Sequence, residues 1–244
     1  MDFTGKRIVL IGGSAGIGLA TAKRASQLGA SLVIASRSGQ RLQSAEAQID
    51  GPVECHRLEA TDESAVAQFF SKIGAFDHLS VLVPGATDKQ HTAMFDQFLK
   101  MDSNAFQQVI TNRFWTQCYA ARHGAPNLNA GGSIVFVSNT QPRKAIENYS
   151  ASAAACGAIE TLARVLAMEL APLRVNVIAP GFIETPGTSE IPAKRRAAWE
   201  RITSKQPVRR LGQAEEIAEG MLFLMDNEYT TSVVLDIDGG YRLT

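Results

Sequence analysis

The chain has 244 residues, of which 45% are hydrophobic and 20% charged, and its formal net charge at pH 7 is +0. This composition excludes global disorder and predicts a single packed domain spanning residues 1–244. The balanced charge excludes the basic footprint of a nucleic-acid-binding protein and a general attraction to membranes, so we expect neither as a partner.

A glycine-rich turn follows the first predicted strand, residues 8–11, and leads into a segment with the apolar spacing of a helix. Glycine has no Cβ, so such a turn lets the backbone approach a ligand, and the N–H groups at the helix start favour a phosphate. This strand–turn–helix context is that of a dinucleotide site. The residues expected to bind a cofactor here are Gly12, Ser14, Gly16, Ile17 and Gly18.

The second predicted strand, residues 31–35, ends at Ser36 and Arg37. In dinucleotide folds this strand end meets the adenosine ribose, where an acidic residue accepts from the ribose hydroxyls and repels a 2′-phosphate. A hydroxyl and a guanidinium group suit a phosphate instead, so the sequence favours NADP(H) over NAD(H). We interpret Arg41, further along, as part of a solvated helix face.

The rest of the chain alternates between strand and helix patterns. Apolar runs predict strands at residues 53–58, 79–83, 133–137, 173–178 and 233–237. Helical spacing predicts helices at residues 41–49, 95–121, 152–170, 194–202 and 215–224, and another that begins after Thr61 or Asp62. This order predicts an α/β fold, a Rossmann-like doubly wound parallel sheet in three layers, with ligands at the carboxyl ends of the strands. Residues 84–86 predict a close-approach turn, and residues 185–207 a substrate lid.

Several motifs coincide along the chain: Gly12-x-x-x-Gly16-Ile17-Gly18, the runs 169–176 and 180–186, and Asp238-Gly239-Gly240. With these motifs the chain resembles the short-chain dehydrogenase/reductase family over nearly its whole length. The resemblance implies a Rossmann-like subunit, a nicotinamide cofactor, a small-molecule substrate and a homodimer or homotetramer. It also implies further cofactor-binding residues, namely Glu59, Ala60, Gly85, Pro180, Gly181, Ile183 and Thr185.

The chemistry of that family depends on a Ser, a Tyr four residues before a Lys, and a supporting Asn. The Lys lowers the pKa of the Tyr, so that the phenol can exchange a proton with the substrate oxygen during hydride transfer. Tyr149 is followed four residues later by Ala153, so it cannot supply this pair.

A second register fits the helix pattern better. Counting back from Glu169 without a gap puts Ser152 where the family has Tyr and Cys156 where it has Lys. We favour this register because an insertion in a helix would rotate its buried face. The family's Ser then falls at Asn139 and its Asn at Arg113 or Asn112, and the Tyr–Lys pair is absent in both registers.

The candidate catalytic positions are therefore Asn139, Tyr149, Ser152 and Cys156. Tyr149, about one turn before Ser152, is the candidate replacement acid; the alternative is a loop residue that packs at the subunit surface. Without a nearby Lys its phenol should keep a pKa of ~10, so it would donate a proton but act poorly as a base. Cys156 has no charged neighbour close in sequence and is interpreted as a packed, inert thiol.

No other chemistry stands out. None of the four histidines pairs with a second ligand at metal-binding spacing, so we expect no metal. The three cysteines form an odd, sparse set that favours a reducing compartment, and the N-terminus lacks a signal-peptide pattern. No apolar run approaches the length of a membrane span. We therefore expect a cytoplasmic protein.

The size of each catalytic contribution decides what the missing Tyr–Lys pair means for activity. Acid–base assistance contributes ~10²–10⁴-fold, whereas alignment of donor and acceptor can reach an effective molarity of ~10⁵–10⁸ M. Hydride transfer can therefore survive the loss, and we expect an NADP(H)-dependent oxidoreductase with an atypical active site that acts on a small organic carbonyl, alcohol or activated double bond. Two alternatives remain: a cofactor-binding protein without catalysis, serving as a sensor or partner subunit, and a non-redox isomerase, dehydratase or cyclase.

Overall fold

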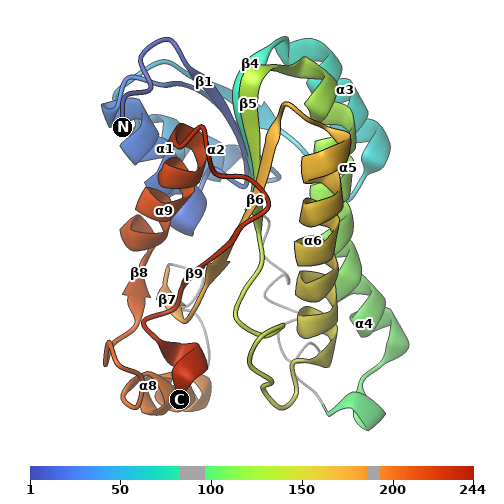
Figure 1. Ribbon diagram of the computed structural model, residues 1–244, viewed down its shortest axis with the longest axis vertical. Coiled ribbons are helices and arrows are strands. Elements are labelled where there is room, and N and C mark those ends of the chain that lie inside the picture. The colour runs from blue at the N-terminus through green and yellow to red at the C-terminus, as the bar shows by residue number, and fades with distance from the viewer. Residues whose placement is uncertain (83–96, 186–192) are drawn as a thin grey trace.

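The fold is a seven-stranded parallel sheet covered by helices on both faces (Figure 1). The computed structural model describes residues 1–82, 97–185 and 193–244. The strand order is β3-β2-β1-β4-β5-β6-β9, which confirms the predicted doubly wound, Rossmann-like arrangement. The strands are β1 Arg7–Ile11, β2 Ser31–Ser36, β3 Val53–Arg57, β4 Phe76–Val81, β5 Leu128–Val137, β6 Arg174–Pro180 and β9 Val234–Ile237.

The helices divide between the two faces of the sheet. They are α1 Gly16–Gln27, α2 Gly39–Glu46, α3 Glu63–Ile73, α4 Ser103–Ile110, α5 Thr116–Gly124, α6 Ser150–Glu169, α8 Ala193–Thr203 and α9 Ala214–Asp226. Ile8 and Leu10 of β1 belong to the core under α1, α2 and α9, whereas Val9 and Ile11 belong to the core under α3, α5 and α6. Alternate residues of a strand point to opposite faces, so both faces of this sheet are apolar and three layers form.

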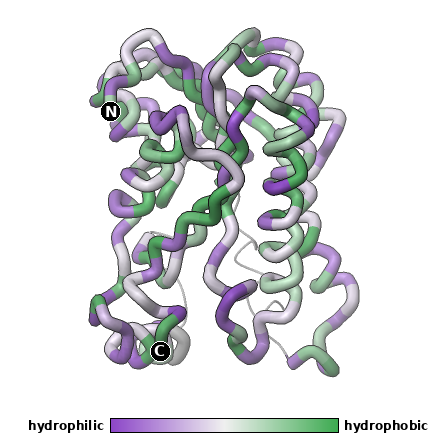
Figure 2. The backbone as a smooth tube through the Cα atoms, viewed as in Figure 1, coloured by the Kyte–Doolittle hydropathy of each residue, from purple (hydrophilic) through white to green (hydrophobic). Residues whose placement is uncertain are grey.

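The carboxyl ends of the strands lie at the lower edge of the sheet in Figure 1. The central strands consist mainly of hydrophobic residues, whereas the segment between β5 and α6 at this edge is mostly hydrophilic (Figure 2). This is the edge where a doubly wound sheet binds its ligands.

Two strands begin earlier than the sequence predicts. β4 begins at Phe76 and ends at Val81, and β5 begins at Leu128, so it includes the two glycines that were expected to precede it. A Cβ on Gly132 would lie 2.6 Å from the backbone oxygen of Asp77, so glycine here permits close contact between neighbouring strands rather than a turn. The predicted turn at residues 84–86 lies outside the described residues.

The described part of the stretch predicted to be helical from residue 95 to 121 contains four parts. A 3₁₀ turn, Phe98–Lys100, precedes α4, and a π-helical turn, Thr111–Trp115, joins α4 to α5. Such π turns are rare and often occur at functional sites. Asp62 caps α3 by accepting from the backbone N–H groups of Ser64 and Ala65, as the sequence predicts.

The predicted lid is described in part. Outside residues 186–192 it contains α8. A small second sheet, which was not predicted, flanks the lid and pairs β7 Ile183–Glu184 with β8 Gly212–Gln213. Arg196 of α8 forms a 2.7 Å ion pair with Glu184, and its hydrogen bond lowers the pKa of that carboxyl. Glu184 of β7 therefore fastens α8 to the segment that follows β6.

One described helix, α6, is long and apolar enough to cross a membrane by length and composition, contrary to the expectation that no segment reaches that length. Its most apolar window is 39% buried, and the helix packs on β5 and β6. This position is that of a core helix of the three-layer fold.

Candidate active site

The turn between β1 and α1 depends on glycine at several positions. Gly12 has a φ of +93°, and a Cβ there would lie 2.6 Å from the backbone oxygen of Leu82. A Cβ on Gly18 would lie 2.2 Å from the oxygen of Gly12. No side chain caps the N-terminus of α1, and its first turn contains no acidic residue. The turn is thus a tight backbone cradle that opens a helix, which fits a pyrophosphate group.

The end of β6 lies against this cradle. A Cβ on Gly16 would lie 3.4 Å from the side chain of Thr185, so the two predicted cofactor-binding segments meet in space. Gly181 donates from its backbone to Ile237 over 3.0 Å, and a Cβ on it would lie 2.8 Å from the Cα of Asp238. Glycine is required at position 181 because β6 and β9 end in contact here.

The remaining predicted cofactor-binding residues occupy less direct positions. The Ile17 side chain packs against α9, so a contact with a cofactor would come from its backbone. The carboxylate of Glu59 accepts from the Thr61 hydroxyl over 2.7 Å. The side chains of Ser14, Ala60, Pro180 and Ile183 are buried, and Gly85 lies outside the described residues.

Cationic side chains surround the end of β2. Ser36 donates to the backbone oxygen of Ser38 over 3.3 Å, and Arg37 is exposed beside it. Arg57, at the end of β3, pairs with Ser36 in the sheet register and donates to the backbone oxygen of Arg37 over 3.2 Å. Arg57 was not predicted from the sequence. The available signal was that the predicted strand at residues 53–58 would lie parallel to the one at residues 31–35 and end at the same edge of the sheet. The exposed Arg41 adds a further positive charge nearby.

Asn139 and Ser152 meet at the carboxyl end of β5. The Asn139 side-chain amide donates to the Ser152 hydroxyl over 3.2 Å and to the Gln141 side chain over 2.9 Å. The amide oxygen of Asn139 accepts from the backbone N–H of Gln141 over 2.8 Å, which fixes the orientation of the amide. Ser152 lies in the first turn of α6 and is 2% exposed. Two of the predicted positions therefore form one hydrogen-bonded pair.

Arg113 lies in the π turn, and its side chain reaches Cys156, a third predicted catalytic position. Its guanidinium Nη1 lies 3.9 Å from the Sγ of the buried Cys156, and its Nε is buried without a hydrogen-bond partner among the residues that the structure describes. The buried Gln117 accepts from and donates to the backbone of Val137, and also donates to the Arg113 carbonyl over 2.7 Å. The π turn is thereby fastened to the end of β5. Cys156 has a cationic neighbour after all, 43 residues away in sequence.

Tyr149 stands at the N-terminus of α6. Its backbone oxygen accepts from Ala153 over 2.8 Å, and its side chain is half-buried. Burial, followed by the charge of Tyr149, raises the pKa of the Tyr241 phenol. Lys144 lies in the loop between β5 and α6, which also contains Tyr149, and its Nζ is 4.4 Å from the centre of the Tyr241 ring.

A buried charge network supports Asn139 from behind. Arg143 forms ion pairs with Glu160 and with Asp236, and donates to the backbone oxygen of Asn139 over 2.9 Å. Ser138 donates to Glu160 over 2.6 Å. Burial alone would lower the pKa of Arg143, but its two carboxylate partners outweigh that effect and raise it. Arg242 also forms an ion pair with Asp236, over 3.2 Å, so two cations balance the two carboxylates while the network positions the loop after β5.

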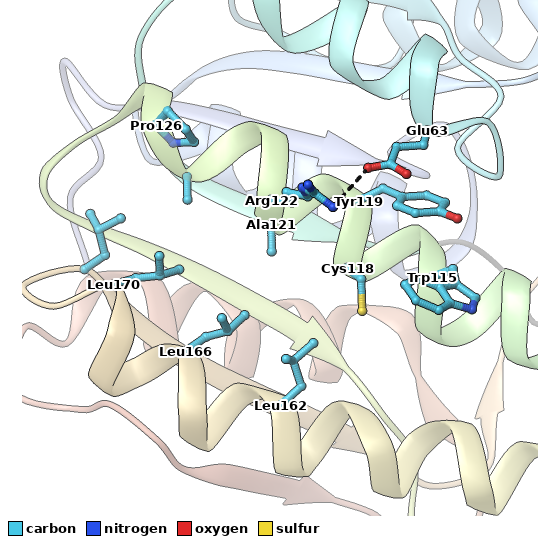
Figure 3. Close-up of a pocket in the computed structure, with 12 residues that line it drawn as sticks. Glu63, Trp115, Cys118, Tyr119, Ala121, Arg122, Pro126, Leu162, Leu166 and Leu170 are labelled. Carbon is cyan, nitrogen blue, oxygen red and sulfur yellow. Dashed lines mark ion pairs between the residues drawn. The ribbon is translucent and has the colours of Figure 1, made fainter.

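A large apolar groove lies elsewhere, between α5 and α6 (Figure 3). We call it the α5–α6 groove; it measures about 790 Å³ and is lined by residues that include Trp115, Cys118, Tyr119, Leu162, Leu166 and Leu170. Burial raises the pKa of the Cys118 thiol to about 12. The groove lies along the second half of α6, away from Ser152, and its lining is unsuited to a dinucleotide. Among the described residues no His, Cys, Asp and Glu side chains cluster as a metal site would require.

Comparisons with known proteins agree with this architecture. The model of the protein family described as Enoyl-(Acyl carrier protein) reductase matches residues 12–242 of this chain. The cis-4-hydroxycyclohexanecarboxylate dehydrogenase of Sinomonas cyclohexanicum is 31% identical, covering 98% of this chain and 97% of its own. The 3-oxoacyl-[acyl-carrier-protein] reductase FabG of Thermotoga maritima is 32% identical, and the match covers 98% of this chain and 99% of that protein.

A solved structure is similar as well. A small-chain dehydrogenase in complex with NADPH superposes with a TM-score of 0.84 at 33% identity, over 98% of this chain and 99% of that one. The chain belongs to the short-chain dehydrogenase/reductase family, a family of oxidoreductases, as its sequence predicts.

Proposed function

We propose that this protein is an NADP(H)-dependent oxidoreductase that transfers hydride to or from a small organic carbonyl, alcohol or activated double bond. The observation that carries the proposal is the glycine cradle at the start of α1, which lies in contact with Thr185. The residues present fit a nicotinamide dinucleotide, because a Cβ at Gly12 or Gly18 would fill the cradle.

The end of β2 supports NADP(H) over NAD(H). Ser36, Arg37 and Arg57 place a hydroxyl and two guanidinium groups where an NAD-binding protein would have an acidic residue. Guanidinium groups bind phosphate through charge-assisted hydrogen bonds. The NADPH complex of the similar dehydrogenase agrees with this preference.

We further propose that the substrate oxygen binds at Asn139 and Ser152. The bound nicotinamide supplies or accepts the hydride. The amide of Asn139 and the hydroxyl of Ser152 donate toward the oxygen that gains charge, while Gln141 holds the amide and Arg143 holds the backbone of Asn139. Such donors can stabilise the developing charge, and Tyr149 at the N-terminus of α6 is the proposed source of the proton.

The family's acid is absent from this proposed site, which limits the substrates. The positions of the family's Tyr and Lys hold Ser152 and Cys156, and neither can replace a phenol paired with an ammonium group. The loss of ~10²–10⁴-fold in acid–base assistance leaves alignment as the main contribution. The preferred substrates are therefore activated carbonyls or double bonds that need little help from a proton donor.

The test is NADPH oxidation across a panel of aldehydes, activated ketones and enones, followed at the nicotinamide absorbance. The proposal predicts turnover with at least one activated class and a clear preference for NADPH over NADH. Tight NADPH binding without turnover on any member would instead favour a cofactor-binding sensor or partner subunit. Product formation without a net change in NADPH would favour a non-redox isomerase, dehydratase or cyclase.

We also propose that two or four copies assemble through the α5–α6 groove, in a cytoplasmic protein. Trp115, which lines this groove, is 44% exposed, and Leu162, Leu166 and Leu170 on its other wall are only half-buried, which supports a second copy as its cover. Sedimentation should give a dimer or tetramer, and Leu166→Glu should shift it toward monomer. Tyr229→Glu, at another exposed aromatic residue, is the matched control. A monomeric wild-type protein would contradict the proposal.

A further inference from the structure

One positive charge of the proposed site lacks an acidic partner. No carboxylate of the described residues lies within ion-pair distance of Arg113, and its Nε is buried without a hydrogen-bond partner. Arg143, by contrast, is held by both Glu160 and Asp236. Within the described part of the chain, one guanidinium group near Cys156 thus has no carboxylate to neutralise it.

The polypeptide fixes this guanidinium rather than leaving it in solvent. Arg113 lies in the π turn, and Gln117 fastens the backbone of that turn to Val137 at the end of β5. A buried N–H group without a partner is unfavourable, and a bound anion would relieve that cost. The thiol of Cys156 is too weak an acceptor to serve as such a partner.

We propose that Arg113 binds a carboxylate group of the substrate, so that the substrates are oxo- or hydroxycarboxylic acids. This inference rests on the proposed function and names its substrate class. A guanidinium group presents paired N–H donors that match the two oxygens of a carboxylate. A single unneutralised charge matches one carboxylate better than it matches a phosphate dianion.

The spacing along α6 defines the length of the substrate. Ser152 and Cys156 lie one helical turn apart, which corresponds to about 5–6 Å between their Cβ atoms. With the reacting oxygen at Ser152 and the carboxylate at Arg113 beside Cys156, a few carbon atoms separate the two groups. A ring or short chain that carries a carbonyl and a carboxylate at opposite ends satisfies this distance.

The experiment compares 4-oxocyclohexanecarboxylate with its methyl ester, which differs mainly in charge. Wild-type protein should show a kcat/KM for the acid about 10- to 100-fold above that for the ester, the range expected for hydrogen bonds to a charged group. Arg113→Gln should bring the ratio close to one, and Arg113→Lys should restore part of it. Lys72→Gln, an equal change of charge on the exposed face of α3, should leave the ratio intact.

A second readout does not require turnover. Calorimetric titration with the acid, with and without NADP⁺, should show binding to wild-type protein that Arg113→Gln weakens by about 10-fold or more, with an unchanged melting temperature. Equal affinity for acid and ester, or a loss of NADPH affinity in Arg113→Gln parallel to the loss of acid binding, would overturn the inference. Absence of NADPH binding to wild-type protein would instead overturn the proposed function, while the acid titration still tests Arg113.

Discussion

The side-chain amide of Asn139 donates to the hydroxyl of Ser152 over 3.2 Å, across 13 residues of sequence. One partner follows β5 and the other lies in the first turn of α6, so the contact ties a strand end to the helix beside it. The Arg143 network holds the backbone of Asn139, and Gln141 holds its amide. This pair is the centre of the proposed site and can be tested by substitution.

Ser152→Ala should lower kcat with little effect on cofactor affinity. Removal of one donor to a developing oxyanion costs about 10²–10³ in kcat, and Asn139 would retain part of the stabilisation. The measurement is steady-state turnover with the best substrate of the panel, beside an NADPH titration. Ser71→Ala, at an exposed serine of α3, provides the control. If Ser152→Ala turned over as fast as the wild-type protein, Ser152 would have no part in the mechanism.

Tyr149→Phe tests the replacement acid. If the phenol donates the proton, its loss should lower kcat, by less than the ~10²–10⁴-fold that a phenol paired with an ammonium group supplies, and leave KM nearly unchanged, because only the transition state is affected. Turnover is compared with that of Tyr229→Phe, since Tyr229 is fully exposed at the surface. Equal turnover of Tyr149→Phe and wild type would show that the proton comes from another group or from water.

Ser36→Asp should convert the cofactor preference. The new carboxylate would repel the 2′-phosphate, so the Kd for NADPH should rise about 10- to 100-fold while the Kd for NADH stays the same or falls. Nicotinamide fluorescence gives both constants, and Ser71→Asp controls for the added charge. An unchanged ratio of the two constants would contradict the assignment of the β2 end to the 2′-phosphate.

Glu160→Ala should destabilise the fold around the proposed site. Glu160 is 6% exposed and pairs with Arg143, so its removal leaves a buried cation with a single partner. Breaking a buried pair costs about 3 kcal/mol, which corresponds to a fall in melting temperature of about 6–12 °C for a protein of this size. Glu147→Ala, at an exposed acid, should change it by much less. Equal melting temperatures would show that the network contributes no net stability.

His78 should make the fold sensitive to acid. Burial, opposed by Asp77 and reinforced by Arg174 and Lys6, lowers the pKa of His78 to about 4 from an ordinary value of 6.5. The unfolded chain binds the proton more readily, so stability is full above pH 6.5 and falls as the pH decreases toward 4. The loss over this interval is of order 3 kcal/mol.

Urea unfolding at pH 7.5 and pH 5 measures this effect. His78→Gln should reduce the difference between the two pH values, because glutamine does not titrate, although Ser133 loses its 2.9 Å contact with the imidazole. If the difference were the same in wild type and variant, His78 would not be the responsible group.

The sequence predicted the features that depend on local pattern. The glycine turn, the order of strands and helices, and Asp62 as a helix cap all follow from the spacing of a few neighbouring residues. Helical periodicity also put Ser152 and Asn139 at positions of the family's site, and their side chains form a hydrogen bond. Their catalytic role stays a prediction.

Other features depend on residues that meet only in the folded chain. The contact between Arg113 and Cys156 requires the π turn, which no local pattern indicated. The Arg143 network joins a loop, α6 and β9, and Arg57 reaches the cofactor region only because β3 lies beside β2. The predicted strand began only at residue 133, since the close approach of Gly132 to the backbone of β4 is invisible in sequence.

The central claim is that the glycine cradle and the arginine-rich end of β2 bind NADP(H). The most direct measurement is a titration of the purified protein with NADPH and with NADH, followed by nicotinamide fluorescence. We predict saturable NADPH binding with a Kd at least 10-fold lower than that for NADH, the equivalent of one charge-assisted hydrogen bond. Failure of both nucleotides to bind would contradict the account, as would a preference for NADH.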